Sequence, residues 1–352
     1  MKIFSKLYKK VVIFFFLNFY GKINTDQSRI KDKVLIKKKK YKKKIYKFIE
    51  IKNGRVFTNT SDVAYISKNT LIDGPSMQFR NNFNRHIKSN ITLKIGTPKI
   101  YRKIQSRVFS LLCGVDANHN YYHWFFDSLT KYFIFKKHYN FQEDDFFLVP
   151  NYQYDYQIKS LKILNIKNTL NAYNLKHLKA KKIISLNYIP ISINHPKWII
   201  DEMRKKFLPK IKKPNKQKLK IFINRSGISS AARDISNKKE LISYLKKKNF
   251  LIIDPSTLSF SEEIKLFNSA KIVLGIYGAA LVNVIFCRNK THIVELKNNK
   301  TDNLYKNIIK NSKLKYHSLI SKKINSNKSH RAFDGSIVVN LTKLSKILSK
   351  IN

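Results

Sequence analysis

The second half of the chain alternates short apolar runs with amphipathic stretches. From residue 219 onward, the runs LKIFIN, FLIID, KIVLG and HIVEL are separated by segments such as KKELISYLKKKN and SEEIKLFNSA. Short, continuous apolar runs are typical of strands buried on both faces, and apolar residues three and four positions apart predict helices between them. This alternation predicts an α/β fold with a parallel sheet covered by helices on both faces.

The first half of the chain has a less regular pattern. Between residues 51 and 114, strand-like runs such as RVFTNT, VAYIS and VFSLLCG are separated by Asn, Gly and Pro, so we expect an irregular, strand-rich beginning. Residues 121–138, YYHWFFDSLTKYFIFKKH, contain no Gly or Pro and predict a largely buried helix. A second helix is expected to start at Pro196, and the apolar stripe of LTKLSKILSKI predicts a C-terminal helix.

The chain is long enough for two domains with separate cores. The segment PKIKKPNKQK, at residues 209–218, interrupts the pattern with two prolines and five lysines and is the predicted boundary. We therefore expect four parts, which are a basic N-terminal segment at 1–50, a first α/β domain at 51–209, a second α/β domain at 216–320, and a tail with a helix at 321–352.

The composition is strongly basic. The 71 Lys and Arg against 21 Asp and Glu give a formal net charge of +50, and residues 33–52 hold the densest run of lysines. Such a balance favours nucleic acid, an anionic membrane or acidic substrates as partners. The chain is also rich in Asn, Ile, Phe and Tyr, so a bias toward A/T-rich codons explains the lysines equally well, and nucleic acid is not the expected partner. A non-enzymatic basic protein that binds nucleic acid or an anionic membrane through its Lys-rich front is the alternative to an enzyme.

The N-terminus carries an apolar run from Val11 to Tyr20 that is broken by Asn18. It is shorter than the ~20 residues of a membrane-spanning helix, so we expect it either to pack on its own domain or to lie on an anionic membrane surface. Cys113 and Cys287 lie far apart and match no disulfide or zinc pattern, which favours a reducing compartment. The expected location is the cytoplasm, with a peripheral position at the inner membrane face as one form of it.

The stretch GIYGAALVN, residues 275–283, contains two of the chain's nine glycines within four positions. A buried strand ends there and a helix is expected to start, so free backbone N–H groups would face the carboxyl edge of the sheet and favour an anion. Gly278 and Ala279 leave room for a phosphate to approach the backbone. The alternative is that these small residues only allow close packing of the helix on the strand.

Two arginines follow the first strand of the same half, in NRSGISSAARDISN. Guanidinium groups bind phosphate with two hydrogen bonds, and ligands of open α/β sheets bind at the carboxyl ends of the strands. Arg225 and Arg233 are therefore candidates for a diphosphate, unless both are ordinary surface charges. A nicotinamide dehydrogenase or a methyltransferase is the less favoured alternative, because no Gly-rich fingerprint follows the strand LKIFIN.

Four blocks in order resemble glycosyltransferase family 61: NYYHWFFDSLTKY, NRSGISSAARDISN, LSFSEEIKLFNSAKIVLG, and GAALVN followed by HIVEL. The resemblance covers residues 118–296. It implies a GT-B fold with two facing Rossmann-like domains, the first on the acceptor side and the second binding a nucleotide sugar. It also implies inversion at the anomeric carbon without a bound metal or other cofactor. The expected partners are a nucleotide-sugar donor and a saccharide or lipid-linked saccharide acceptor, in surface polysaccharide synthesis.

The resemblance assigns roles to individual residues. His123 and Asp127 are the catalytic candidates, because residues four apart on a helix share a face and can form one acid/base unit; the alternative is a pair that only ties the helix to its domain. EDD at 143–145 is the nearest approach to a metal motif and is better explained as the charged start of a strand. The donor-binding candidates are Arg225, Arg233, Tyr277, Gly278, Ala279, Ala280, Asn283 and Glu295.

The chain departs from the family at one of these positions. The family usually has His-Gly-Ala where this chain has Tyr277, Gly278 and Ala279. A histidine can give the phosphate a proton or a positive charge, whereas a tyrosine offers a neutral hydroxyl on a longer ring. If backbone N–H groups and arginines carry most of the diphosphate binding, the tyrosine is tolerated; if the imidazole matters, activity is weakened.

Overall fold

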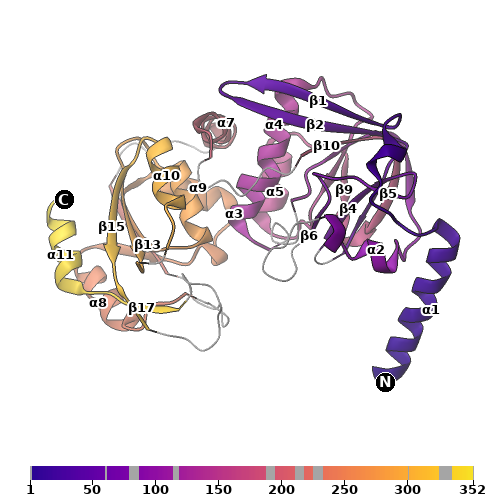
Figure 1. The fold of residues 1–352 in the computed structure, drawn as a ribbon. Helices are drawn as coiled ribbons and strands as arrows, with labels where there is room; N and C mark the ends of the chain where they lie inside the picture. The colour runs from indigo at the N-terminus through magenta and orange to yellow at the C-terminus, as the bar shows by residue number, and fades with distance from the viewer. Residues whose placement is uncertain are drawn as a thin grey trace. The chain divides into compact units, whose positions relative to one another are not determined.

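The computed structural model describes residues 2–59, 62–78, 87–113, 119–187, 195–210, 218–224, 233–299, 301–324 and 335–351 (Figure 1). The chain divides into two compact units. The first comprises Met1–Gln157 and Asn165–Ile191, and the second comprises Ile158–Leu164 and Ser192–Asn352. The predicted boundary segment at 209–218 lies mostly outside the described residues, so the four predicted parts remain a prediction.

A large mixed sheet forms the centre of the first unit, with strands in the order β5-β4-β3-β10-β7-β8-β9. On this path β10, β7, β8 and β9 run parallel, while β3, β4 and β5 pair antiparallel; β1 and β2 form an antiparallel hairpin that joins the sheet through β10, and β6 pairs with β4. The strands are β1 (Val34–Tyr41), β2 (Lys44–Lys52), β3 (Arg55–Thr58), β4 (Asp62–Ser67), β5 (Thr70–Leu71), β6 (Met77–Gln78), β7 (Arg102–Ser110), β8 (Phe146–Val149), β9 (Thr169–Asn171) and β10 (His177–Leu186).

The strand-rich beginning is confirmed, and the parallel part of the first unit's sheet is limited to β7, β8, β9 and β10. Its early runs alternate with tight turns, which join neighbouring strands antiparallel, whereas parallel strands need a crossover segment. The helices of the first unit are α1 (Lys2–Tyr20), η1 (Gln27–Ile30), η2 (Ile87–Ser89), α2 (Thr92–Ile95), α3 (Tyr121–His123), η4 (Trp124–Leu129), α4 (Thr130–His138) and α6 (Ala172–Leu175). A further helix, α5 (Asp155–Ile163), starts in the first unit, but from Ile158 onward it is counted with the second.

The predicted helix at 121–138 is present as α3, η4 and α4 in direct succession. α4 packs on the sheet through Phe135, whose ring lies 6.1 Å from that of Phe48 on β2 and 5.2 Å from that of Phe109 on β7. The side chains from Thr130 to Phe135 are all buried. Aromatic packing on two strands therefore holds this helix in place.

The second unit has the predicted doubly wound form. Its main sheet has five parallel strands in the order β12-β11-β13-β14-β15. These strands are β11 (Leu219–Ile223), β12 (Phe250–Ile253), β13 (Ala270–Ile276), β14 (His292–Lys297) and β15 (Lys315–Ile320). Two later strands, β16 (Lys322–Ile324) and β17 (Ser336–Val338), form a separate antiparallel pair. The helices are α7 (Lys197–Phe207), η5 (Leu208–Lys210), α8 (Lys238–Lys247), η6 (Pro255–Thr257), α9 (Phe260–Asn268), η7 (Ala279–Phe286), α10 (Leu304–Asn311) and α11 (Leu341–Ser349).

Local signals place most of these helices correctly. Pro196 precedes α7, and Ser259 starts α9 with a capping box in which its side chain and that of Glu262 each bind the other's backbone N–H. α8 begins directly after Asn237, but the side chain of this N-cap residue makes no capping hydrogen bond and bonds the backbone of Val339 instead. α11 buries Leu344 and Leu348 in the same apolar core as β11, β13 and β14.

Candidate active site

The turn that carries the predicted catalytic pair has unusual backbone geometry. Asn120 caps the start of α3 by accepting hydrogen bonds from the backbone N–H groups of Tyr122 and His123. The next six residues, η4, form a π-helix, in which Trp124, Phe125 and Phe126 are all buried. π-helical turns are rare and occur often at functional sites. Here the wider turn accompanies the burial of three consecutive aromatic side chains, while Asp127 stays partly exposed.

His123 and Asp127 are in direct contact. Nδ1 of His123 lies 2.5 Å from Oδ2 of Asp127, and the side chains are 16% and 14% exposed, so the pair is partly accessible to solvent. When the carboxylate accepts the Nδ1 proton, the neutral imidazole keeps a lone pair on Nε2, which is the arrangement of a general base. The predicted contact is confirmed; the catalytic role stays a prediction.

The segment directly after β7 holds this helix in place. Ser128 donates to the carbonyl of Leu111 at 2.6 Å, Lys131 donates to the carbonyl of Leu112, and the thiol of Cys113 lies 3.9 Å from the carbonyl of His123. These three contacts fix the helix along consecutive residues of one extended segment. They restrain the orientation of the His–Asp pair.

Lys131 is a residue of this site that the sequence analysis missed. Its side chain is buried, with 6% exposure, and it follows Asp127 by four positions, as Asp127 follows His123. Burial lowers the pKa of Lys131, while the charges of Cys113 and Asp127 raise it. The spacing of three polar residues on one helical face was the available signal, but it could not show that the lysine is buried.

In the second unit, the donor-binding candidates Tyr277 and Gly278 lie at a topological switch point. β12 lies on one side of β11 in the sheet, whereas β13, β14 and β15 follow on its other side. The direction in which successive strands are added therefore reverses between β11 and β13. Ligands of open α/β sheets bind outside the carboxyl ends of the strands at such a point. β13 leads there into Tyr277 and Gly278, and β11 leads into Asn224. Arg225 follows directly but lies outside the described residues.

Arg233 and Tyr277 are packed together. The guanidinium carbon of Arg233 lies 5.3 Å from the centre of the Tyr277 ring, and its Nη1 donates to the Tyr277 carbonyl at 3.4 Å. The Tyr277 hydroxyl donates to Oδ1 of Asp302 at 3.0 Å, and the ring meets Tyr305 edge to face at 5.0 Å. Burial and the Asp302 charge raise the pKa of Tyr277 far above its usual value. The hydroxyl is thus neutral and engaged with Asp302, which the sequence analysis did not identify.

The turn after β13 serves both close packing and an open helix start. A Cβ at Gly275 would lie 3.2 Å from side-chain atoms of Ile223 and Leu281, so a larger residue there would require these side chains to shift by a few tenths of an ångström. Gly278 is the N-cap residue of η7, which is a 3-10 helix from Ala279 rather than the expected α-helix. Ala279 and Ala280 are partly exposed, whereas Asn283 is buried. The packing explanation therefore holds for Gly275, and the phosphate explanation stays a prediction for Gly278 to Ala280.

Glu295 lies inside the sheet, beside Gly275 of β13 and Ser318 of β15. Its side chain is fully buried; Oε2 accepts a hydrogen bond from the Tyr316 hydroxyl at 2.6 Å and lies 3.8 Å from the Lys297 ammonium. Among the described residues, Oε1 has no hydrogen-bond partner. Burial raises the pKa of Glu295, against the lowering by Tyr316 and Lys297. Its role in donor binding stays a prediction.

Within the described ranges, no three His, Cys, Asp or Glu side chains cluster so as to hold a metal ion. Asp145 of the EDD stretch accepts from Arg107 at 2.6 Å, immediately before β8. That acidic stretch is therefore the charged start of a strand, as expected.

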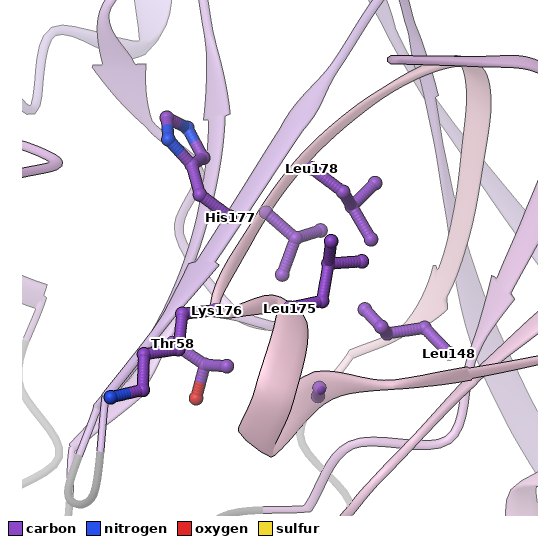
Figure 2. Close-up of a pocket in the computed structure, with 8 residues that line it drawn as sticks. Thr58, Leu148, Leu175, Lys176, His177 and Leu178 are labelled. Atoms are coloured by element: carbon purple, nitrogen blue, oxygen red, sulfur yellow. The ribbon is translucent and has the colours of Figure 1, made fainter. Parts of the chain in front are cut away.

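A separate pocket lies in the first unit between β3, α6 and β10. Figure 2 shows Leu148, Leu175 and Leu178 gathered in it, with the ring of His177 directed away from them. The space between these side chains is too small to hold a water molecule. Its lining contains neither member of the His123–Asp127 pair, so this pocket is not the candidate active site.

Residues 121–294 match the family model described as Glycosyltransferase 61, which covers close to half of the chain and includes both the His–Asp pair and the switch point. The protein is therefore a glycosyltransferase. It belongs to glycosyltransferase family 61, as the four sequence blocks indicated. No curated protein matches the sequence. The alternatives of a non-enzymatic basic protein, a dehydrogenase and a methyltransferase are set aside by this match.

Proposed function

We propose that the protein is an inverting, metal-independent glycosyltransferase of GT-B architecture that uses a nucleotide sugar to extend a saccharide or lipid-linked saccharide in surface polysaccharide synthesis. The observation that supports this best is the 2.5 Å contact between His123 and Asp127 inside the family-matched region. An imidazole oriented by a carboxylate is suited to remove a proton from a hydroxyl.

In the proposed reaction, the acceptor hydroxyl oxygen attacks the anomeric carbon from the face opposite the leaving group. Nε2 of His123 takes the hydroxyl proton as the new C–O bond forms, and Asp127 stabilises the resulting imidazolium through Nδ1. The bond between the anomeric carbon and the diphosphate oxygen breaks at the same time, and the nucleoside diphosphate leaves with the electron pair. One displacement of this kind inverts the anomeric configuration.

The departing diphosphate needs positive charge or hydrogen-bond donors. We propose that Arg225, Arg233 and the backbone N–H groups at the start of η7 supply them. The position of Arg233 beside Tyr277 at the switch point supports this assignment. The Tyr277 hydroxyl donates to Asp302. Its proposed role is to hold the tyrosine ring in place and not to bind the diphosphate.

A screen of nucleotide sugars by thermal shift, followed by a transfer assay with the stabilising donor, tests the proposal. Asp127→Asn and His123→Gln are expected to lower turnover by about 10²–10⁴-fold, the usual contribution of a general base, with donor affinity nearly intact. Arg107→Lys, which alters an ion pair elsewhere in the first unit, is the control. Near wild-type turnover in either variant would make that residue structural.

We also propose that α1 lies on an anionic membrane surface, with the enzyme at the inner face of a cytoplasmic membrane. In Figure 1, α1 extends away from the sheet of the first unit. The side of α1 that carries Leu17 lies against Gly96, while its other side exposes large apolar side chains that are 56–70% accessible, namely Leu7, Tyr8, Val11, Phe14, Phe15 and Phe19. Lys9 and Lys10 are exposed beside them.

An apolar helical face flanked by lysines fits a negatively charged interface. Among the described residues, no helix is both long enough and apolar enough to span a bilayer. Sedimentation with vesicles containing phosphatidylserine should decrease strongly when Val11, Phe14 and Phe15 are all replaced by serine, and Leu251→Ser, at an exposed leucine of the second unit, is the control. Equal sedimentation of the triple variant and the wild type would refute membrane docking.

A further inference from the structure

The hairpin of the first unit carries positive charge that the proposed reaction does not use. β1 and β2 are joined by a turn at Lys42 and Lys43. Six lysines around this turn are exposed, namely Lys38, Lys40, Lys42, Lys43, Lys44 and Lys47. In the described part of the chain none of the six forms an ion pair with a carboxylate, because Glu50, the single acidic residue of the two strands, pairs with Lys37 and Lys182. The charge of residues 38–47, the basic hairpin end, is therefore uncompensated.

The strand register places three of these lysines on one face. Lys38 lies directly opposite Lys47, and Lys40 follows Lys38 on the same face, two residues along β1. Like charges directly opposite one another destabilise a strand pair. On the other face, the ring of Tyr41 meets that of His138, at the end of α4, edge to face at 6.0 Å. One face of the basic hairpin end thus packs on α4, and the other presents three ammonium groups to solvent.

The basic hairpin end projects from the edge of the sheet at which the His–Asp pair lies. β10 ends at Leu186, opposite Phe48 of β2, so most of residues 38–47 extend beyond it. β7 runs parallel to β10, and both strands therefore end at the same edge. Leu111 follows β7 there, and its carbonyl binds the hydroxyl of Ser128 in η4. An extended ligand at this edge can contact the hairpin and the helix of the His–Asp pair.

α1, the helix proposed to lie on a membrane, packs at the opposite edge. The ring of Tyr20, at the end of α1, lies 5.4 Å from the rings of Tyr101 and His177. Tyr101 precedes β7 and His177 begins β10, and the nine residues of β7 separate the two edges by about 30 Å. Figure 1 shows the turn of the hairpin at the side of the first unit away from α1. The basic hairpin end is therefore assigned a different partner from α1.

We propose that the basic hairpin end binds an anionic acceptor, a saccharide chain that carries carboxylate or phosphate groups. This inference rests on the proposed function, since a glycosyltransferase requires an acceptor, and it names the charge of that acceptor. Lysines at alternate positions of a strand are about 7 Å apart, and such a row is complementary to a chain with repeated negative charges. The helical run from His123 to His138 is about 20 Å long. The acceptor must therefore contain several sugar residues to occupy both places.

The experiment measures binding of labelled saccharides to the full chain by fluorescence anisotropy, without a donor. The probes are an oligogalacturonate for carboxylate and a phosphorylated oligomannose for phosphate, and the tighter of the two identifies the anionic group. The variant Lys38→Gln/Lys40→Gln/Lys47→Gln is compared with wild type and with a control of equal charge change, Lys239→Gln/Lys246→Gln/Lys247→Gln, at three exposed lysines of α8.

We expect the hairpin variant to bind the tighter probe at least about tenfold more weakly, and the control to lose less than about threefold. Arginine at the same three hairpin positions should restore binding. Because Lys38 and Lys47 repel each other, the glutamine variant should keep the wild-type Tm or exceed it. Equal losses in the hairpin variant and the control would show that overall charge alone binds the probe, and would overturn the inference.

Two further probes address other roles of the lysines. A larger loss of affinity for single-stranded DNA than for both saccharides would identify nucleic acid as the partner and overturn the inference. Lysines on exposed strands also prevent pairing with another sheet. Aggregation of the hairpin variant together with wild-type affinity for the saccharides would assign the lysines that role instead.

Transfer kinetics separate this inference from the proposed function. If both hold, KM for the anionic acceptor rises about tenfold in the hairpin variant, and the effect appears in KM and not in kcat. Binding that depends on the hairpin, without any transfer by wild type, would refute the proposed function and leave the binding site intact. Equal kcat/KM of wild type for neutral and anionic acceptors would refute the anionic acceptor and leave the proposed function intact.

Discussion

The replacement of Tyr277 by phenylalanine tests how the second unit tolerates a tyrosine where family 61 usually has a histidine. The change removes a single hydroxyl and keeps the ring, so the contacts with the Arg233 guanidinium and the Tyr305 ring remain. What is lost is the 3.0 Å hydrogen bond to Oδ1 of Asp302. The effect should therefore appear in stability rather than in diphosphate affinity.

The magnitude follows from the partners of Asp302. A hydrogen bond to a charged acceptor contributes about 1.5–3 kcal/mol. Oδ1 of Asp302 also accepts from the backbone N–H of Leu304 at 2.9 Å, so the carboxylate is not left without a donor. We therefore expect a loss at the lower end of that range, about 1.5 kcal/mol, which corresponds to a decrease of about 3–6 °C in Tm for a unit of this size.

The assay combines thermal unfolding with titration of a nucleoside diphosphate. Tyr244→Phe is the matched control, because the Tyr244 hydroxyl is buried in the same unit without a hydrogen-bond partner in the described part of the chain. Its removal should leave stability unchanged or slightly increased. For Tyr277→Phe, the diphosphate Kd should change by less than about threefold, which is under 0.7 kcal/mol. Wild-type stability together with a tenfold weaker Kd would show that the hydroxyl contacts the ligand and not Asp302.

Four further outcomes are expected. Tyr277→His should change the transfer rate by at most a few-fold; a rise of about a hundredfold (~2.7 kcal/mol) would mean that the natural chain has lost a leaving-group contact. Arg233→Ala should weaken nucleoside diphosphate binding by about 1.5–3 kcal/mol in isothermal titration, and unchanged affinity would remove Arg233 from the site. Gly275→Ala should cost about 1–3 kcal/mol in urea unfolding, since the added Cβ meets Ile223 and Leu281 at 3.2 Å. Burial lowers the pKa of His177 to about 4, with the Lys99 carbonyl raising it and the Arg55 charge lowering it further. Between pH 6.5 and 4 the His177 side chain is protonated in the unfolded chain but neutral in the folded protein. The free energy of unfolding is therefore unaffected by this group above pH 6.5 and decreases by about 2–3 kcal/mol as the pH falls to 4. His177→Asn should flatten this pH dependence in equilibrium unfolding, and an unaltered slope would argue against it.

Part of the candidate site could be predicted because its geometry is local. The spacing of His123 and Asp127 on a continuous helix is sufficient to bring their side chains together, whatever the helix packs against. The same holds for the capping box of Ser259 and Glu262, whose two hydrogen bonds lie within one turn. The alternation of apolar runs and amphipathic segments likewise determined the parallel sheet of the second unit, because buried strands and amphipathic helices have different periods.

Other features depend on contacts between residues far apart in the sequence, which a local pattern does not encode. The strand order, and hence the switch point between β11 and β13, follows from which edges pair. The Tyr277 hydroxyl binds Asp302, 25 positions away, and Asn237 binds Val339 in place of capping its own helix. The sequence does not distinguish Lys131 from an exposed lysine, because its burial results from the packing of α4 against the segment that follows β7. The sequence by itself determined the elements and the His–Asp pair; the tertiary structure decided the electrostatic surroundings of that pair, because burial and charge depend on the packing of the whole unit.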